Sequence, residues 1–107
     1  MEKSKAFTFI GFAIKARKVK MGVNAVATLK RAELLIVCHT ASENTVKDAA
    51  SLAKKLKAKL FVLNEINLSE VTFKENCKLI AITDKPLSEA IFKSDERRLV
   101  EYSGGLL

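Results

Sequence analysis

A run of basic residues leads into a glycine near the start of the chain. The run contains Lys15, Arg17, Lys18 and Lys20, and Gly22 follows two residues later. Glycine adopts a positive φ or allows another backbone to approach closely, so it favours a tight turn here. If a helix begins directly after Gly22, its free amide groups and positive dipole end suit a phosphate or a base acceptor. These residue types, in this order, predict an anion-binding turn.

The helix expected after this turn, over residues 23–31, has one apolar and one polar face. Its polar face carries Asn24, Thr28 and Arg31 at i, i+4 and i+7 spacing, next to Val23 at the helix start. An asparagine amide can pair with base edges, and arginine and lysine contact phosphates. Asn24 has a second interpretation, because an asparagine at a helix start also satisfies backbone amides. The sequence leaves both roles open.

The excess positive charge lies in the first third of the chain. The net charge is +7 over 107 residues; residues 1–31 contain eight cations and one anion, and residues 32–107 contain eleven of each. Such polarised charge favours a polyanionic partner, most often nucleic acid and next an anionic membrane surface. Lysine-rich loops and helix ends without a partner are the plain alternative.

The other chemistry-bearing residues favour no enzyme class. His39 is the only histidine, and no carboxylate is placed in the sequence to orient it towards Thr40 or Ser42 for nucleophilic catalysis. Neither phosphate-loop nor dinucleotide spacing occurs. One histidine and two separated cysteines cannot complete a zinc site. We therefore expect no catalytic residue, no metal and no cofactor.

The aromatic residues argue against a stacking platform for single strands. There is no tryptophan, and the phenylalanines mostly fall in apolar patterns, which indicate core packing for nearly all of them. They are Phe7, Phe9, Phe12, Phe61, Phe73 and Phe92. This composition favours reading a folded RNA by its shape, its phosphates and a few base contacts.

The composition also indicates a compartment. No apolar run approaches the ~20 residues that cross a bilayer, and two cysteines form no disulfide framework. The basic start followed by residues 6–14 resembles a short signal peptide, but these residues fit one helical face and run into Lys15. We read them as the first helix and expect a cytoplasmic protein.

Apolar periodicity predicts a single α/β domain. Helices are expected over residues 4–16, 23–31, 43–57, 68–74 and 86–93, and strands over 18–21, 33–38, 60–64 and 77–83. Continuous apolar strands alternating with helices predict a three-layer α/β/α sandwich around a four-stranded mixed sheet. The second and third strands, joined by a helix, should be parallel. Residues 1–94 are expected to form the folded core and 95–107 a tail.

The chain from about Phe7 to Phe92 resembles the kink-turn-binding ribosomal-protein family, whose namesake is the archaeal large-subunit ribosomal protein L-seven-Ae. The resemblance rests on a first helix, on Arg17–Asn24 leading into a helix, and on a strand followed by Ala41–Lys47. It is closest to the bacterial YlxQ-type branch. Membership implies an α/β/α sandwich that recognises a sharply bent RNA.

The resemblance also implies which residues contact RNA. Gly22, Val23 and Asn24 match the family's Gly-x-Asn turn against tandem sheared G·A pairs, whereas the family glutamate and lysine fall on Ala25 and Thr28. The family has an apolar loop before the last strand that packs on a flipped-out base. Here the corresponding segment, 73–78, is charged, and Lys74 and Lys78 become candidate phosphate contacts.

The leading hypothesis is a monomeric, ribosome-associated, non-enzymatic protein that binds structured RNA, kink-turn-like or ribosomal. Arg17, Lys18, Lys20 and Arg31 would neutralise phosphates, and Gly22, Val23, Asn24 and Thr28 would lie near the bases. The alternative is a protein-interaction module with the same fold whose RNA site has degenerated. No membrane partner is expected.

Overall fold

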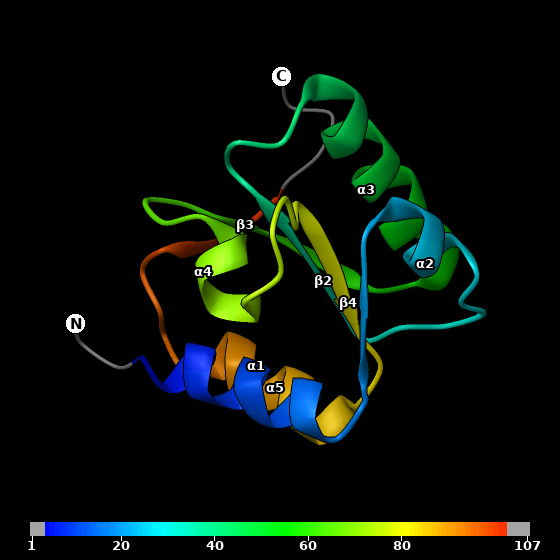
Figure 1. The fold of residues 1–107 in the computed structure, drawn as a ribbon. Helices are drawn as coiled ribbons and strands as arrows, with labels where there is room; N and C mark the ends of the chain where they lie inside the picture. Colours follow the sequence, from blue (N-terminus) through cyan, green and yellow to red (C-terminus); the bar gives the residue numbers. More distant parts are fainter. Residues whose placement is uncertain (1–3, 103–107) are drawn as a thin grey trace.

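A computed structural model describes residues 4–102 of the chain. Within this range it is a mixed α/β domain with five helices and a five-stranded sheet (Figure 1). The elements in chain order are α1 (Lys5–Lys15), β1 (Val19–Met21), α2 (Val23–Ala27), β2 (Leu34–Cys38), α3 (Glu43–Leu56), β3 (Lys59–Leu63), α4 (Leu68–Thr72), β4 (Leu79–Ile82), α5 (Lys85–Lys93) and β5 (Leu99–Glu101).

The sheet is mixed, with strand order β1-β4-β2-β3-β5. β2 and β3 are parallel, with Leu34 opposite Lys59, so the predicted parallel pair is confirmed. β4 lies antiparallel to both β1 and β2, and β5 lies antiparallel to β3. As a result β1, β2 and β3 all begin at one end of the sheet, where β4 ends.

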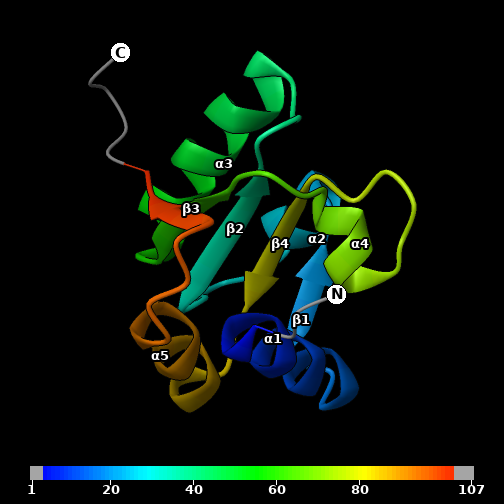
Figure 2. The same ribbon diagram turned by 90° about the vertical axis from the view of Figure 1, so that its left-hand side faces the viewer.

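Buried side chains form two clusters, one on each face of the sheet. Successive residues of β2 alternate between them, with Leu34 and Ile36 in the first cluster and Leu35 and Val37 in the second. Buried residues of α1, α4 and α5 join the first cluster, and those of α2 and α3 join the second. The helices accordingly lie on both sides of β2 and β4 (Figure 2). Burial on both faces is why these strands are continuous apolar runs.

Side-chain caps fix where three of the helices begin. Ser42 begins α3, because its hydroxyl accepts a hydrogen bond from the Thr45 amide at 3.2 Å. Asp84 begins α5 by accepting from the Leu87 amide at 2.9 Å. The Ser4 hydroxyl likewise accepts from the amide at position 6, at 3.1 Å. Each cap satisfies an amide that the helix itself leaves without a partner.

The prediction of a four-stranded sheet followed by a C-terminal tail is wrong in one respect. Leu99–Glu101 forms a fifth strand, β5, inside the segment 95–107 that the sequence assigns to the tail. Its pairing with β3 is extended by two backbone bonds, from Asn64 N–H to the Arg98 carbonyl at 2.7 Å and from Tyr102 N–H to the Leu60 carbonyl at 2.8 Å. Residues 103–107 lie outside the described residues.

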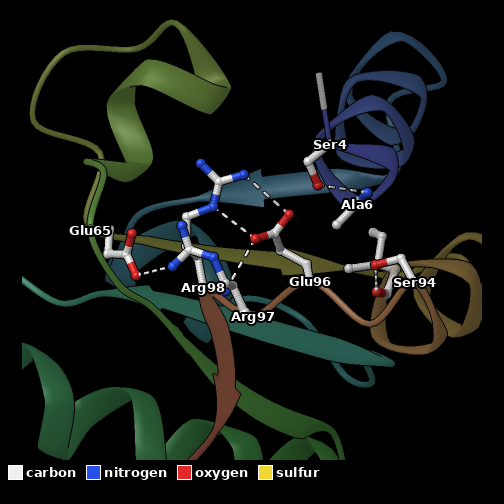
Figure 3. Close-up of polar contacts among 8 residues, drawn as sticks. Ser4, Ala6, Glu65, Ser94, Glu96, Arg97 and Arg98 are labelled. Carbon is white, nitrogen blue, oxygen red and sulfur yellow. Dashed lines mark hydrogen bonds and ion pairs between the residues drawn. The ribbon is translucent and has the colours of Figure 1, made fainter. Parts of the chain in front are cut away.

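A half-buried ion pair attaches this segment to α1. The Arg98 guanidinium donates to both carboxylate oxygens of Glu96, at 2.7 and 3.2 Å (Figure 3). The guanidinium also lies over the Phe7 ring of α1, 4.8 Å from the centroid. These hydrogen bonds hold the pKa of the Glu96 carboxyl at about 2, below its ordinary 4.5; burial opposes the shift, and the Ser4 hydroxyl reinforces it.

We expect Glu96→Gln to lower the free energy of unfolding by about 1–3 kcal/mol near neutral pH, because a carboxylate whose pKa falls on folding stabilises the native state. This stabilisation is complete above the unfolded pKa of 4.5 and is lost as the pH falls towards 2. Urea unfolding of wild type and variant should therefore differ at neutral pH and converge near pH 2.

Glu65→Gln is the matched control for Glu96→Gln. Glu65 pairs with Arg97 on the surface, where the two side chains are 52% and 75% exposed. Such a pair is worth less than about 1 kcal/mol. Equal destabilisation by the two variants would contradict the role given to Glu96.

Candidate nucleic-acid interface

The predicted turn lies between β1 and α2, and Gly22 forms it. Gly22 has φ 92° and ψ 154°, so the expected positive φ is confirmed. Its amide donates to the Leu79 carbonyl at 2.8 Å, and its carbonyl accepts from the Val26 amide at 3.0 Å. Gly22 thus joins the end of β1, the start of β4 and the first turn of α2, with its backbone in a conformation that glycine alone adopts readily.

Asn24 is exposed and does not cap the helix. The cap position of α2 belongs to Gly22, which makes no side-chain hydrogen bond there. Among residues 4–102, no hydrogen bond uses the Asn24 side chain. Of the two roles that the sequence leaves open, the helix-cap role is therefore wrong, and the amide is available to a ligand.

The polar helix face that the sequence predicts does not extend to Arg31. α2 ends at Ala27, and Thr28 follows as its C-cap. The Thr28 hydroxyl donates to the Ala25 carbonyl at 2.6 Å, a local bond that competes with further helix. A helix continued to residue 31 would also leave only two residues to reach β2 at Leu34. Arg31 lies instead in the loop before β2.

The turn lies at the end of the sheet where β1, β2 and β3 finish and β4 starts. We name this the turn end and define it by Gly22–Asn24, by Thr40 after β2, and by segment 73–78 before β4. Val23 is half-buried beside Gly22 and packs against the second core cluster. Lys74 is exposed, and Lys78 is half-buried. Segment 73–78 leads into Leu79, whose carbonyl accepts the Gly22 amide, and the Lys78 carbonyl accepts the Cys38 amide at 2.8 Å.

A polar cluster fixes Lys78 at the turn end. Its Nζ donates to Thr40 Oγ1 at 2.7 Å, and Thr40 Oγ1 lies 3.1 Å from the buried thiol of Cys38. Burial raises the pKa of Cys38, but hydrogen bonds from Thr40 and the Leu68 amide, with the Lys78 charge, outweigh it and lower the pKa overall. The cluster therefore holds one ammonium group in place at the turn end.

Three of the predicted cations lie at the opposite end of the sheet. The Lys18 carbonyl accepts from the Thr83 amide at 2.9 Å, just beyond the end of β4, and Arg17 precedes Lys18. Arg31 approaches the same end, two residues before Glu33. Lys20 lies between the two ends on edge strand β1, exposed on the α2 face of the sheet. The structure therefore divides the predicted site between two ends.

Phe73 is a candidate contact that the sequence analysis missed. Its side chain is 91% exposed, and its φ of 60° ends α4. Phe73 and Phe12, which is 51% exposed, are the exceptions to the core packing predicted for nearly all of the phenylalanines. The apolar spacing of α4 does not reveal a positive φ. The one available signal is that polar residues, starting with Lys74, follow Phe73 directly.

Two further features of the described residues concern metal binding and membrane spanning. Within residues 4–102, no three His, Cys, Asp or Glu side chains lie close enough to hold a metal ion. The same range holds no helix with the length and apolarity to cross a bilayer. His39 Nδ1 lies 3.0 Å from the Leu63 carbonyl, a contact that links β2 to β3.

Comparison with known proteins establishes the fold only. No protein-family model and no curated protein matches the chain. A solved structure of a protein of unknown function from Bacillus halodurans is similar, with a TM-score of 0.71 and 21% identity over 86% of this chain and 97% of that one. At this identity the likeness shows that the mixed α/β fold is shared.

We expect Gly22→Ala to destabilise the protein by about 1–3 kcal/mol, the cost of placing a side chain in a region that is nearly exclusive to glycine. Gly11→Ala is the control, because it lies inside α1 and should stabilise by up to about 1 kcal/mol. A Cβ at either position meets no atom within 4 Å, so the contrast reports backbone conformation alone. Urea unfolding measures both; equal effects would show that Gly22 is unstrained.

Proposed function

We propose that this protein binds structured RNA without catalysing a reaction, and that the turn end makes the contact that depends on RNA shape. The observation that carries the proposal is the exposed hydrogen-bonding amide of Asn24 directly after the Gly22 turn, together with a 91%-exposed ring, Phe73, on the segment that leads into β4. An exposed ring and an exposed amide are the groups that recognise unstacked bases.

The two groups have different tasks in this proposal. The Asn24 amide donates to and accepts from a base edge. The Phe73 ring stacks on a base displaced from the helix, a contact worth about 1–3 kcal/mol. Lys74 and the ammonium group of Lys78, which is hydrogen-bonded to Thr40, contact neighbouring phosphates. At Gly22 no heavy atom lies within 4 Å of a side-chain position, so a base can approach the backbone closely.

The class of RNA follows from the family resemblance. We propose a kink-turn-like or ribosomal RNA, a three-layer α/β/α arrangement, and a cytoplasmic, ribosome-associated monomer. The two core clusters on opposite sheet faces support the layering. The family glutamate and lysine positions are Ala25 and Thr28, and the Thr28 hydroxyl is occupied by the Ala25 carbonyl. Phe73 and Lys78 therefore carry more of the recognition in this chain.

We expect Asn24→Ala and Phe73→Ala each to reduce the preference for a kink-turn RNA over a plain duplex by roughly 5–100-fold, the equivalent of about 1–3 kcal/mol. The dependence of affinity on salt should stay the same, because neither side chain is charged. Fluorescence anisotropy with both RNAs over a salt series measures both quantities.

Phe12→Ala is the matched control, since Phe12 is a second exposed phenylalanine on a different element, α1. It should leave the preference unchanged. If wild type binds the two RNAs equally, or if Phe12→Ala acts like Phe73→Ala, the proposed recognition by the turn end is incorrect.

A protein-interaction module is the second candidate, and the charge of the turn end favours it. The net charge of this end is only +1, because Glu75 offsets one of Lys74 and Lys78. A purified, tagged chain incubated with ribonuclease-treated ribosomes separates the two. Retention that survives ribonuclease and is abolished in Phe73→Ala would favour the module, whereas release by ribonuclease favours RNA.

A further inference from the structure

The cations of this protein gather at the end of the sheet opposite the turn end. Here the chain enters β1, β2 and β3 and leaves β4, and Figure 1 shows the α1–β1, α2–β2 and β4–α5 connections converging there. Six exposed cations lie in the connections at this end. They are Arg17, Lys18, Lys30, Arg31, Lys57 and Lys85, here termed the strand-start surface.

Nearby carboxylates do not neutralise the strand-start surface. Glu33 and Asp84 lie in the same connections, and two carboxylates cannot offset the six cations. Within residues 4–102, the ion pairs are Arg97–Glu65 and Arg98–Glu96, both far along the chain from these connections. Lys59 adds a further cation at this end, with its Nζ 5.4 Å from the centre of the Phe92 ring.

The width of the strand-start surface suits an extended polyanion. β1 and β3 are separated by β4 and β2, so their starts are about 14 Å apart at ~4.8 Å per strand. Six cations across this width produce a positive potential that one phosphate group cannot neutralise. At the turn end, by contrast, Glu75 offsets one of the two cations, Lys74 and Lys78, and leaves a net charge of +1.

We propose that the strand-start surface binds the phosphate backbone of an RNA duplex, as a contact separate from the turn end. β2 has five residues, so the two ends of the sheet are about 13 Å apart, and one phosphate cannot touch both. The RNA either passes along edge strand β1, where Lys20 lies, or presents two segments. The choice of RNA as the polyanion rests on the proposed function; the location of the surface does not.

A membrane surface fits these residues less well than RNA. Peripheral membrane binding needs apolar side chains that insert beside the cations. Among the described residues, the exposed large apolar side chains are Phe12, Phe73 and Val100, and none lies in the connections that form the strand-start surface. The surface is charged without being amphipathic, which matches phosphate-backbone binding.

The test compares two charge reversals of equal size, Arg31→Glu/Lys85→Glu on the surface and Lys5→Glu/Lys93→Glu at the start of α1 and the end of α5. The probe is a plain RNA duplex, titrated over a salt series. We expect the first variant to lower the slope of log K against log salt by about 2, one for each phosphate that the variant no longer neutralises. The second variant should leave the slope near that of wild type.

Several results would overturn the proposal. These are equal slopes for the two reversals, no duplex binding by wild type at low salt, or binding of phosphatidylserine vesicles in place of the duplex. Arg31→Gln/Lys85→Gln gives the same comparison if the reversals unfold the chain. Loss of the kink-turn preference with the duplex slope intact would contradict the proposed function alone, whereas an unchanged duplex slope in Arg31→Glu/Lys85→Glu would contradict this surface alone, so the two failures are distinguishable.

Discussion

Burial of β2 and β4 on both faces is the constraint on which the rest of this structure depends. All five residues of β2 and all four of β4 are buried, so helices must cover both sides. Neither face of β2 or β4 can then hold a ligand, and the proposed RNA contacts lie at the two ends of the sheet and on edge strand β1. At one end Gly22 turns the chain; at the other, the connections carry the six cations of the strand-start surface.

This arrangement separates two requirements of RNA recognition. Shape-dependent contact needs a few well-placed groups near bases, and the turn end supplies them with a net charge of only +1. Attraction of a polyanion needs many like charges, which the strand-start surface supplies. The order of residues 15–24 suggests that the cations surround Gly22. In that arrangement their mutual repulsion would have destabilised the strained turn.

The sequence predicts the elements that burial specifies. The apolar runs of β2, β3 and β4, the parallel pair and the positive φ of Gly22 are all confirmed. Prediction from the sequence fails where long-range contacts determine the structure. β5 is three residues long and is held by Arg98 over Phe7 and by pairing with β3, which no local pattern shows. The end of α2 at Ala27 depends on where β2 must start, and the exposure of Phe73 depends on one backbone angle.

The dependence on long-range contacts also explains why an uneven distribution of charge along the sequence does not by itself locate the charged surface of the protein. Lys18 and Gly22 are four residues apart, yet β1 is extended and carries them to opposite ends of the sheet. Lys57 and Lys85 come from the electrically balanced part of the chain, and the sheet brings them to the same end as Arg31. The excess of charge in residues 1–31 therefore becomes a surface only when the α3–β3 connection and α5 contribute their own cations. Strand register, more than the order of residues, determines where this protein is positive.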